Sequence, residues 1–131
     1  MTHFIFVYGT LQRGEVQDIA NLEPQPRYIG EGQVRGWLYD LGHCPALILA
    51  ADAPWVRGEV YEIDDSLFRA LDDWEAACGD FTLASVTVQL DQDASGPLSP
   101  PQALQCDIYQ GAPAVRGAPL VANSRWHRQV A

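Results

Sequence analysis

Strand-like segments dominate this sequence, and only one stretch has the pattern of a helix. Residues 66–77 have helical spacing, Asp64-Asp65-Ser66 can cap the free N–H groups at the start, and Gly79 can end the helix. The segments with the composition and spacing of strands are residues 4–8, 28–41, 56–63, 81–90 and 104–109, with a short apolar run at 46–50. Strands joined mostly by loops favour an α+β fold over a doubly wound parallel sheet.

Glycines inside the second of these segments predict that the sheet curves. Gly30, Gly32 and Gly36 interrupt residues 28–41, and glycines inside strands often mark bulges or the bends at a barrel corner. We therefore expect a closed or strongly curved sheet. A chain of 131 residues has the length of one domain, so residues 1–131 are predicted to form a single unit with a C-terminal tail from about residue 111.

The charge balance argues against two classes of partner. The chain has 17 Asp and Glu against 8 Lys and Arg, which gives a formal net charge of -9. Such a surface repels phosphate backbones and anionic lipids. No segment approaches the roughly 20 apolar residues that a membrane helix requires. We predict no nucleic acid partner and no membrane partner.

The three cysteines form no recognisable metal or disulfide pattern. Cys44, Cys78 and Cys106 are far apart in the sequence and form no CxxC pair. Reduced thiols are typical of a cytosolic protein, and the first residues lack the basic and apolar regions of a signal peptide. We therefore predict a cytoplasmic protein with no metal site and no disulfide framework.

The first strand leads directly into a segment that could bind a ligand. The apolar run Phe4-Ile5-Phe6-Val7 is followed by Tyr8-Gly9-Thr10-Leu11. Glycine has no Cβ and lets the backbone come close to a bound molecule, and a turn of this kind can direct several N–H groups at a carboxylate. Taken alone, the segment fits a plain strand-ending turn better than a binding site.

One carboxylate of the predicted helix points in an unexpected direction. At about 100° per residue, Leu67 and Leu71 define the apolar face, and Glu75 falls inside it. Asp72 lies at the margin of that face and Asp73 points away. Burial would raise the pKa of Glu75, which would suit it to act as a general base near neutral pH. The alternatives are that Glu75 reaches solvent past the helix end or pairs with an arginine.

Five motifs in one order carry a resemblance to a known family. They are Phe6-Val7-Tyr8-Gly9-Thr10-Leu11, Gly36-Trp37-Leu38-Tyr39-Asp40-Leu41-Gly42, Cys44-Pro45-Ala46, Gly58-Glu59-Val60-Tyr61 and Leu71-Asp72-Asp73-Trp74-Glu75. Their succession resembles the gamma-glutamylcyclotransferase-like family, which includes the gamma-glutamylamine cyclotransferases. The resemblance implies a small mixed β-barrel with flanking helices.

The resemblance also implies an enzyme that acts on a small gamma-glutamyl substrate without a cofactor. Tyr8, Gly9, Thr10 and Leu11 would hold the α-amino-acid end of the gamma-glutamyl group, and Glu75 would match the family's acid/base glutamate. The substrate's α-amine would attack its own γ-carbonyl, forming 5-oxoproline and releasing an amine or amino acid. The identity of the released group and the oligomeric state stay open.

Two other side chains are candidates for the surroundings of this site. Tyr39, Tyr61 and Tyr109 are expected mainly to pack in the barrel, and Tyr109 is the one of them best placed to contact a ligand through its hydroxyl. Glu59 lies on the predicted strand 56–63 and is expected at the rim or exterior of the barrel, with a contact to the site as the alternative.

The sequence departs from the family pattern just after the helix. The family usually has Tyr-x-Arg after the helix, whereas Phe81-Thr82-Leu83 stands here. A charged partner for the substrate or Glu75 would then be missing, or be supplied by Arg13 or Arg125.

Two alternatives to catalysis stay open. One alternative is a non-catalytic module of the same fold that binds an amino-acid-like ligand, and the other is an acidic protein-interaction domain.

Overall fold

The computed structural model describes residues 2–9, 26–41, 45–78, 81–90 and 103–121. In chain order its elements are β1 (Thr2–Val7), β2 (Arg27–Asp40), β3 (Pro45–Leu49), β4 (Trp55–Asp64), α1 (Asp65–Cys78), β5 (Phe81–Leu90), β6 (Ala103–Gly111) and the 3-10 helix η2 (Pro113–Gly117). None of the helices within these ranges is long and apolar enough to cross a membrane.

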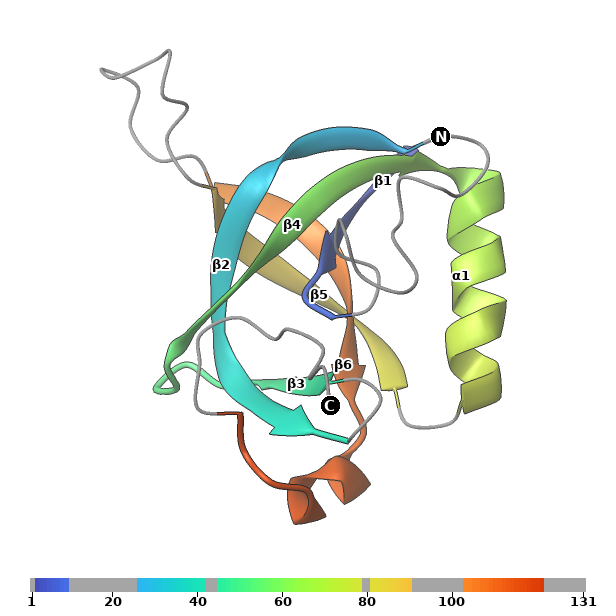
Figure 1. The fold of residues 1–131 in the computed structure, drawn as a ribbon. Coiled ribbons are helices and arrows are strands. Elements are labelled where there is room, and N and C mark those ends of the chain that lie inside the picture. The colour runs from blue at the N-terminus through green and yellow to red at the C-terminus, as the bar shows by residue number, and fades with distance from the viewer. Residues whose placement is uncertain (1, 10–25, 42–44, 79–80, 91–102, 122–131) are drawn as a thin grey trace, which may run out of the picture.

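Five of the strands close into a barrel (Figure 1). Around the barrel the order is β2-β4-β1-β6-β5. β5 then pairs back onto β2, where Gly32 lies opposite Leu90 and Gln33 opposite Gln89. β1 and β6 are parallel, and the other pairings are antiparallel. β3 adds to the far end of β2. The predicted α+β fold, a small mixed β-barrel, is confirmed, with one α-helix among the described residues in place of several.

Alternate residues of the strands build two cores, one inside the barrel and one outside its wall. The inner core consists of buried side chains from all the strands and includes Phe6, Tyr8, Val34, Leu38, Leu47, Val56, Val60, Val88, Cys106 and Ile108. The outer core lies between the wall and α1 and consists of Ile5, Val7, Tyr61, Ile63, Leu67, Leu71 and Tyr109. Strand side chains alternate between the two faces of the sheet. Closure of the barrel buries the inner set, and α1 covers the outer set.

The helix begins where the sequence predicts. The carboxylate of Asp64 accepts hydrogen bonds from the Leu67 backbone N–H at 2.9 Å and the Ser66 hydroxyl at 2.8 Å. These two donors, the Leu67 N–H first, hold the pKa of Asp64 below its ordinary value. Leu67 and Leu71 are 3% and 5% exposed, and each such buried leucine stabilises the fold by about 1.5–3 kcal/mol. The predicted apolar face of the helix is therefore the one that packs on the barrel.

The glycines of β2 mark irregular or crowded positions, as predicted. The register with β4 shifts between Tyr28 and Gly30. Gly32 lies where the barrel closes, and a Cβ there would come within 2.6 Å of Val88 Cγ1 and 3.0 Å of the Gln89 carbonyl oxygen. β2 and β5 can therefore approach each other only because residue 32 has no side chain.

Replacing Gly32 with alanine is expected to lower the free energy of unfolding by about 1–3 kcal/mol, because the added methyl overpacks the closure. Urea unfolding followed by circular dichroism measures this change. Gly30→Ala is the matched control, since a Cβ there meets nothing within 4 Å and alanine restricts the unfolded chain slightly. Equal stability of the two variants would contradict the assigned role of Gly32.

The chain after β6 lies against the barrel. The Asp40 N–H donates to the Pro119 carbonyl at 2.7 Å, and the Val121 N–H donates to the Leu38 carbonyl at 2.8 Å. Leu120 forms an isolated bridge with Tyr39. Residues 119–121 thus pair along the end of β2 that does not pair with β5.

Candidate functional site

Tyr8 directly follows β1 and connects three strands. Its hydroxyl donates to the Tyr109 carbonyl oxygen at 2.6 Å and accepts from the Leu47 backbone N–H at 3.2 Å. The side chain is only 6% exposed. The hydroxyl therefore fixes the end of β1 to β3 and β6, and a contact with substrate, which stays a prediction, would come from the backbone here.

Gly9 packs against β3. A Cβ on Gly9 would lie 2.8 Å from both Cδ and Cγ of Pro45, so the absence of a side chain is used for close contact with the proline. This contact and the Tyr8 hydrogen bonds hold the first half of the predicted binding segment. Thr10 and Leu11, its second half, lie outside the described residues.

Tyr109 joins this region to helix α1. Its hydroxyl donates to Asp72 Oδ1 at 3.1 Å, while its carbonyl accepts the bond from Tyr8. A chain of hydrogen bonds therefore runs from Leu47 through Tyr8 and Tyr109 to Asp72. The predicted contact between the Tyr109 hydroxyl and a ligand stays a prediction, and Asp72 is one partner of this hydroxyl among the described residues.

Asp72 and Asp73 of α1 differ in exposure, and Glu75 follows them in the same helix. Asp72 is half-buried and Asp73 is exposed, as the helical spacing predicts. Glu75 lies within α1, three residues after Asp72, and residues at this spacing lie on neighbouring positions of one helix face. Its side chain is outside the described set. The backbone nevertheless places residue 75 one turn beyond the Tyr109–Asp72 contact.

The sequence reading missed a buried carboxylate on β4. Glu59 is 6% exposed and accepts a hydrogen bond from the Tyr61 hydroxyl at 2.9 Å. It pairs across the sheet with Val7, directly before the Tyr8–Gly9 segment. The expectation of a rim or exterior position is wrong as to exposure, because the outer face of this wall is itself buried. The alternation of Glu59, Tyr61 and Ile63 on one face could have indicated this.

Phe81-Thr82-Leu83, where the family has Tyr-x-Arg, begins β5. Phe81 packs against the outer core that α1 covers. Thr82 and Leu83 are exposed, and Leu83 is 45% exposed. Two of the three positions are therefore exposed to solvent. Arg13 and Arg125, the alternative charged partners, lie outside the described residues.

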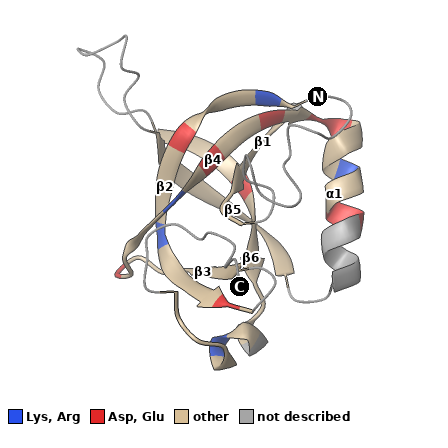
Figure 2. Cartoon of the chain, viewed as in Figure 1, with Lys and Arg blue, Asp and Glu red and all other residues tan. Residues whose placement is uncertain are grey.

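The described charges are mostly acidic and dispersed over the barrel and α1 (Figure 2). Two of the arginines form ion pairs: Arg27 Nη1 lies 3.6 Å from Glu62 Oε1, and Arg69 Nη2 lies 3.0 Å from Asp65 Oδ2. No group of three His, Cys, Asp or Glu residues in the described ranges could hold a metal ion. Burial raises the pKa of the Cys106 thiol to about 12, so this cysteine is a neutral core residue near pH 7.

Comparisons with known proteins agree with this architecture. The family model described as gamma-glutamyl cyclotransferase, AIG2-like, matches residues 5–128. A gamma-glutamylaminecyclotransferase of Homo sapiens is 34% identical over 127 residues, covering 82% of this chain and 78% of that protein. One of Rattus norvegicus is 31% identical over 124 residues, covering 86% and 79%.

A solved structure supports the same relationship. The crystal structure of an AIG2-like protein from Mus musculus superposes with a TM-score of 0.73 at 26% identity, covering 96% of this chain and 88% of that chain. The family match extends over nearly the whole sequence and includes β1, α1 and β6, the elements that carry the candidate site. The chain belongs to the AIG2-like gamma-glutamyl cyclotransferase family.

Proposed function

We propose that this protein is a cofactor-independent gamma-glutamylcyclotransferase that converts a gamma-glutamyl compound into 5-oxoproline and a free amine or amino acid. Family membership and the relatives named gamma-glutamylaminecyclotransferase support the reaction class. The structural observation that carries the proposal is the hydrogen-bonded chain from Leu47 through Tyr8 and Tyr109 to Asp72. This chain holds the Tyr8–Gly9 segment at a fixed position relative to the helix of Glu75.

The reaction requires orientation and proton transfer rather than an external nucleophile. The α-amine nitrogen of the substrate forms a bond to its own γ-carbonyl carbon, and the bond from that carbon to the leaving nitrogen breaks. Both reacting groups belong to one molecule, so holding a folded conformer can lower the barrier by up to about 7–11 kcal/mol. The segment Tyr8–Leu11 would hold the α-carboxylate and direct N–H groups to the developing oxyanion.

Glu75 is proposed to move the protons. An ammonium has no lone pair, so a base must remove a proton from the α-amine before attack. The leaving nitrogen must gain a proton before it departs as an amine. One carboxyl group can accept the first proton and pass it to the leaving nitrogen, and the second proton that the ring nitrogen loses on becoming an amide N–H passes to solvent, which leaves the enzyme unchanged after each turnover.

The panel that tests this proposal consists of gamma-glutamyl amines, gamma-glutamyl dipeptides and glutathione, with 5-oxoproline detected by mass spectrometry. Formation of 5-oxoproline from any of them supports the reaction and identifies the leaving group. Saturable binding of a panel member without product would instead support the non-catalytic binding module. Neither binding nor product across the panel would favour the protein-interaction domain.

Tyr109→Phe and Asp72→Ala are each expected to lower kcat by about twofold to tenfold with little change in KM. This range corresponds to one hydrogen bond worth about 0.5–1.5 kcal/mol, because both changes remove the same link between β6 and α1. Steady-state kinetics of the single and double variants measure the effect, and the double variant should be no slower than the slower single. A rise in KM confined to Tyr109→Phe would instead assign the hydroxyl to substrate binding.

A further inference from the structure

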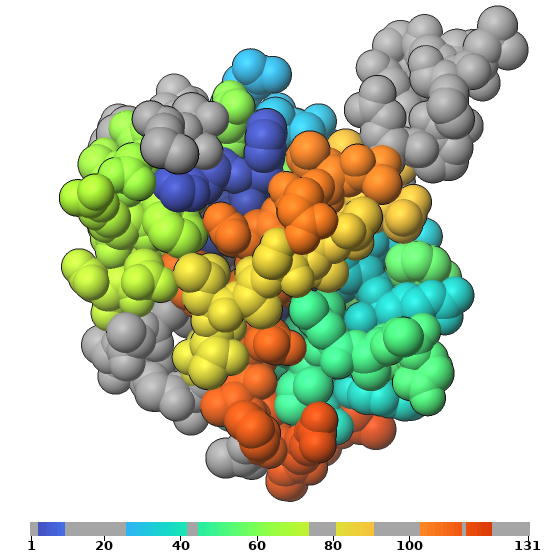
Figure 3. All heavy atoms as spheres, turned by 180° about the vertical axis from the view of Figure 1, so that it is seen from behind, coloured from blue at the N-terminus to red at the C-terminus, as the bar shows by residue number. Residues whose placement is uncertain are grey.

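A pocket opens at the seam where the barrel closes. It has a volume of about 360 Å³, within the range of small-molecule sites. β2 and β5 pair at only two positions. Beyond them β5 (yellow in Figure 3) lies beside β3 and the chain that follows it (green). The described residues that line the pocket come from this region, and none belongs to Tyr8–Gly9, β6 or α1. We call it the seam pocket.

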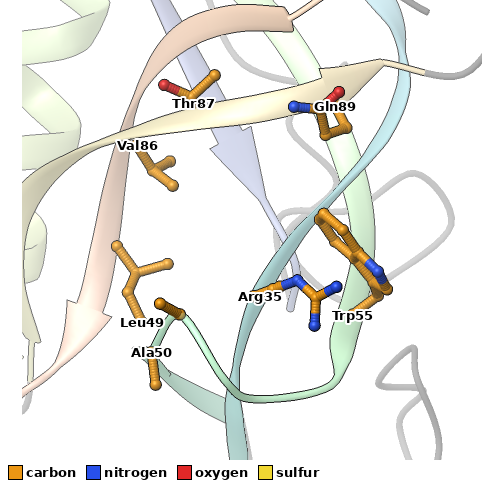
Figure 4. Close-up of a pocket in the computed structure, with 8 residues that line it drawn as sticks. Arg35, Leu49, Ala50, Trp55, Val86, Thr87 and Gln89 are labelled. Atoms are coloured by element: carbon orange, nitrogen blue, oxygen red, sulfur yellow. The ribbon is translucent and has the colours of Figure 1, made fainter.

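The seam pocket combines an apolar wall with one cation. Leu49, Ala50 and Val86 supply the apolar side (Figure 4). Leu49 and Val86 also pack against the inner core, so this wall is supported from behind. Gln89 adds an amide, and Arg35 is the only charged side chain among the described residues of the lining. An apolar pocket with a few polar groups is the usual form of a small-molecule site.

The Arg35 guanidinium is held in position by neutral groups. Its Cζ lies 4.4 Å from the centroid of the Trp55 ring, and Nη1 donates to the Ala53 carbonyl oxygen at 3.2 Å. Stacking and one hydrogen bond fix the plane of the guanidinium while using one of its five N–H donors. Those that remain can bind a carboxylate without further ordering of the side chain, and charge-assisted bonds of this type are among the strongest.

Arg35 also differs from other arginines of the barrel and helix in its electrostatic partners. Arg27 and Arg69 each have a carboxylate within ion-pair distance. For Arg35 the contacts within the described ranges are to a backbone carbonyl and an aromatic ring, and none is to a carboxylate. In a chain with a net charge of -9, this cation keeps its charge available to the pocket.

We propose that the seam pocket binds a small monoanion with an apolar body, with the carboxylate on Arg35 and the hydrocarbon against Leu49 and Val86. The Gln89 amide can supply a further donor to the same carboxylate. This site is separate from the one proposed for the cyclotransferase reaction and does not depend on that reaction.

Two probes of nearly the same shape, one anionic and one neutral, test the proposal. 4-Phenylbutanoate and its neutral analogue 4-phenylbutanamide are titrated into the isotopically labelled full chain and followed by NMR. The anion is expected to bind at least about tenfold more tightly than the amide, which corresponds to one charge-assisted hydrogen-bonded contact. The shifted signals should include the Trp55 indole N–H and the Val86 methyl groups.

Arg35→Gln should bring the affinity for the anion down to that for the amide. Arg116→Gln is the matched control, because it removes the same charge from exposed Arg116 of η2, outside the seam pocket, and should keep the preference. Ala51→Glu is a second variant that leaves Arg35 intact and places a carboxylate at an exposed position of the lining. It should weaken binding of the anion and leave binding of the amide unchanged.

Three results would overturn the proposal. The first is equal affinity of wild type for the two probes. The second is an equal loss of preference in Arg35→Gln and Arg116→Gln, which would reflect net charge rather than the pocket. The third is a set of shifted signals that excludes Trp55 and Val86. If Arg35→Gln fails to fold, Ala51→Glu decides the matter on its own, and an unchanged affinity for the anion would then contradict the site.

Discussion

Glu75→Gln is expected to reduce the formation of 5-oxoproline by at least about 100-fold while substrate still binds. Glutamine has nearly the same shape as glutamate but can neither take the proton of the α-amine nor return one to the leaving nitrogen. General acid–base catalysis contributes about 10²–10⁴-fold to rates, and here one residue is proposed to perform both transfers. Initial rates by mass spectrometry on the panel's best substrate, with binding by calorimetry, measure the two quantities separately.

The control for this change lies on the same helix. Asp73→Asn also replaces a carboxylate with its amide in α1, but Asp73 is exposed, so turnover should stay within about twofold of wild type. Wild-type turnover in Glu75→Gln would exclude Glu75 as the base. Glu59, buried beside the end of β1, would then be the next carboxylate to replace with glutamine.

Local pattern predicted the elements of this fold well. The strand segments, the helix over residues 66–77 and the curvature at the glycines of residues 28–41 all follow from side-chain periodicity and backbone sterics, and the structure confirms them. The parallel pairing of β1 with β6 and the closure of β5 onto β2 do not follow from such patterns. They join segments far apart in the chain, and no nearby residues encode them.

The candidate site was harder to predict for a related reason. An aromatic-Gly segment after a strand is compatible with a tyrosine that faces a ligand and with one that faces the core. The choice depends on what lies opposite, and here Tyr109 and Leu47 lie there. Glu59 shows the same limitation, because a strand pattern tells which residues share a face but not whether a helix covers it.

Tyr8→Phe is expected to lower the free energy of unfolding by about 2–4 kcal/mol without changing the fold. The phenyl ring fills the same space, but the Tyr109 carbonyl and the Leu47 N–H lose their bonds to the hydroxyl. Both groups are in the core, where Leu47 is 0% and Tyr109 is 6% exposed. Removing one partner of a buried hydrogen bond costs about 1–3 kcal/mol, so the two lost bonds account for the predicted loss.

Urea unfolding of Tyr8→Phe beside Tyr39→Phe gives the matched measurement. The Tyr39 ring packs against the small cluster of Ala46, Ile48 and Val115, and no described residue hydrogen-bonds its hydroxyl, so removing that oxygen should change stability by less than about 0.5 kcal/mol. The dependence on urea should be equal in the two variants, because neither alters the surface exposed on unfolding. Equal stabilities would show that the Tyr8 hydroxyl contributes nothing beyond its ring. The position of the turn relative to α1 would then have to depend on the packing of Gly9 against Pro45.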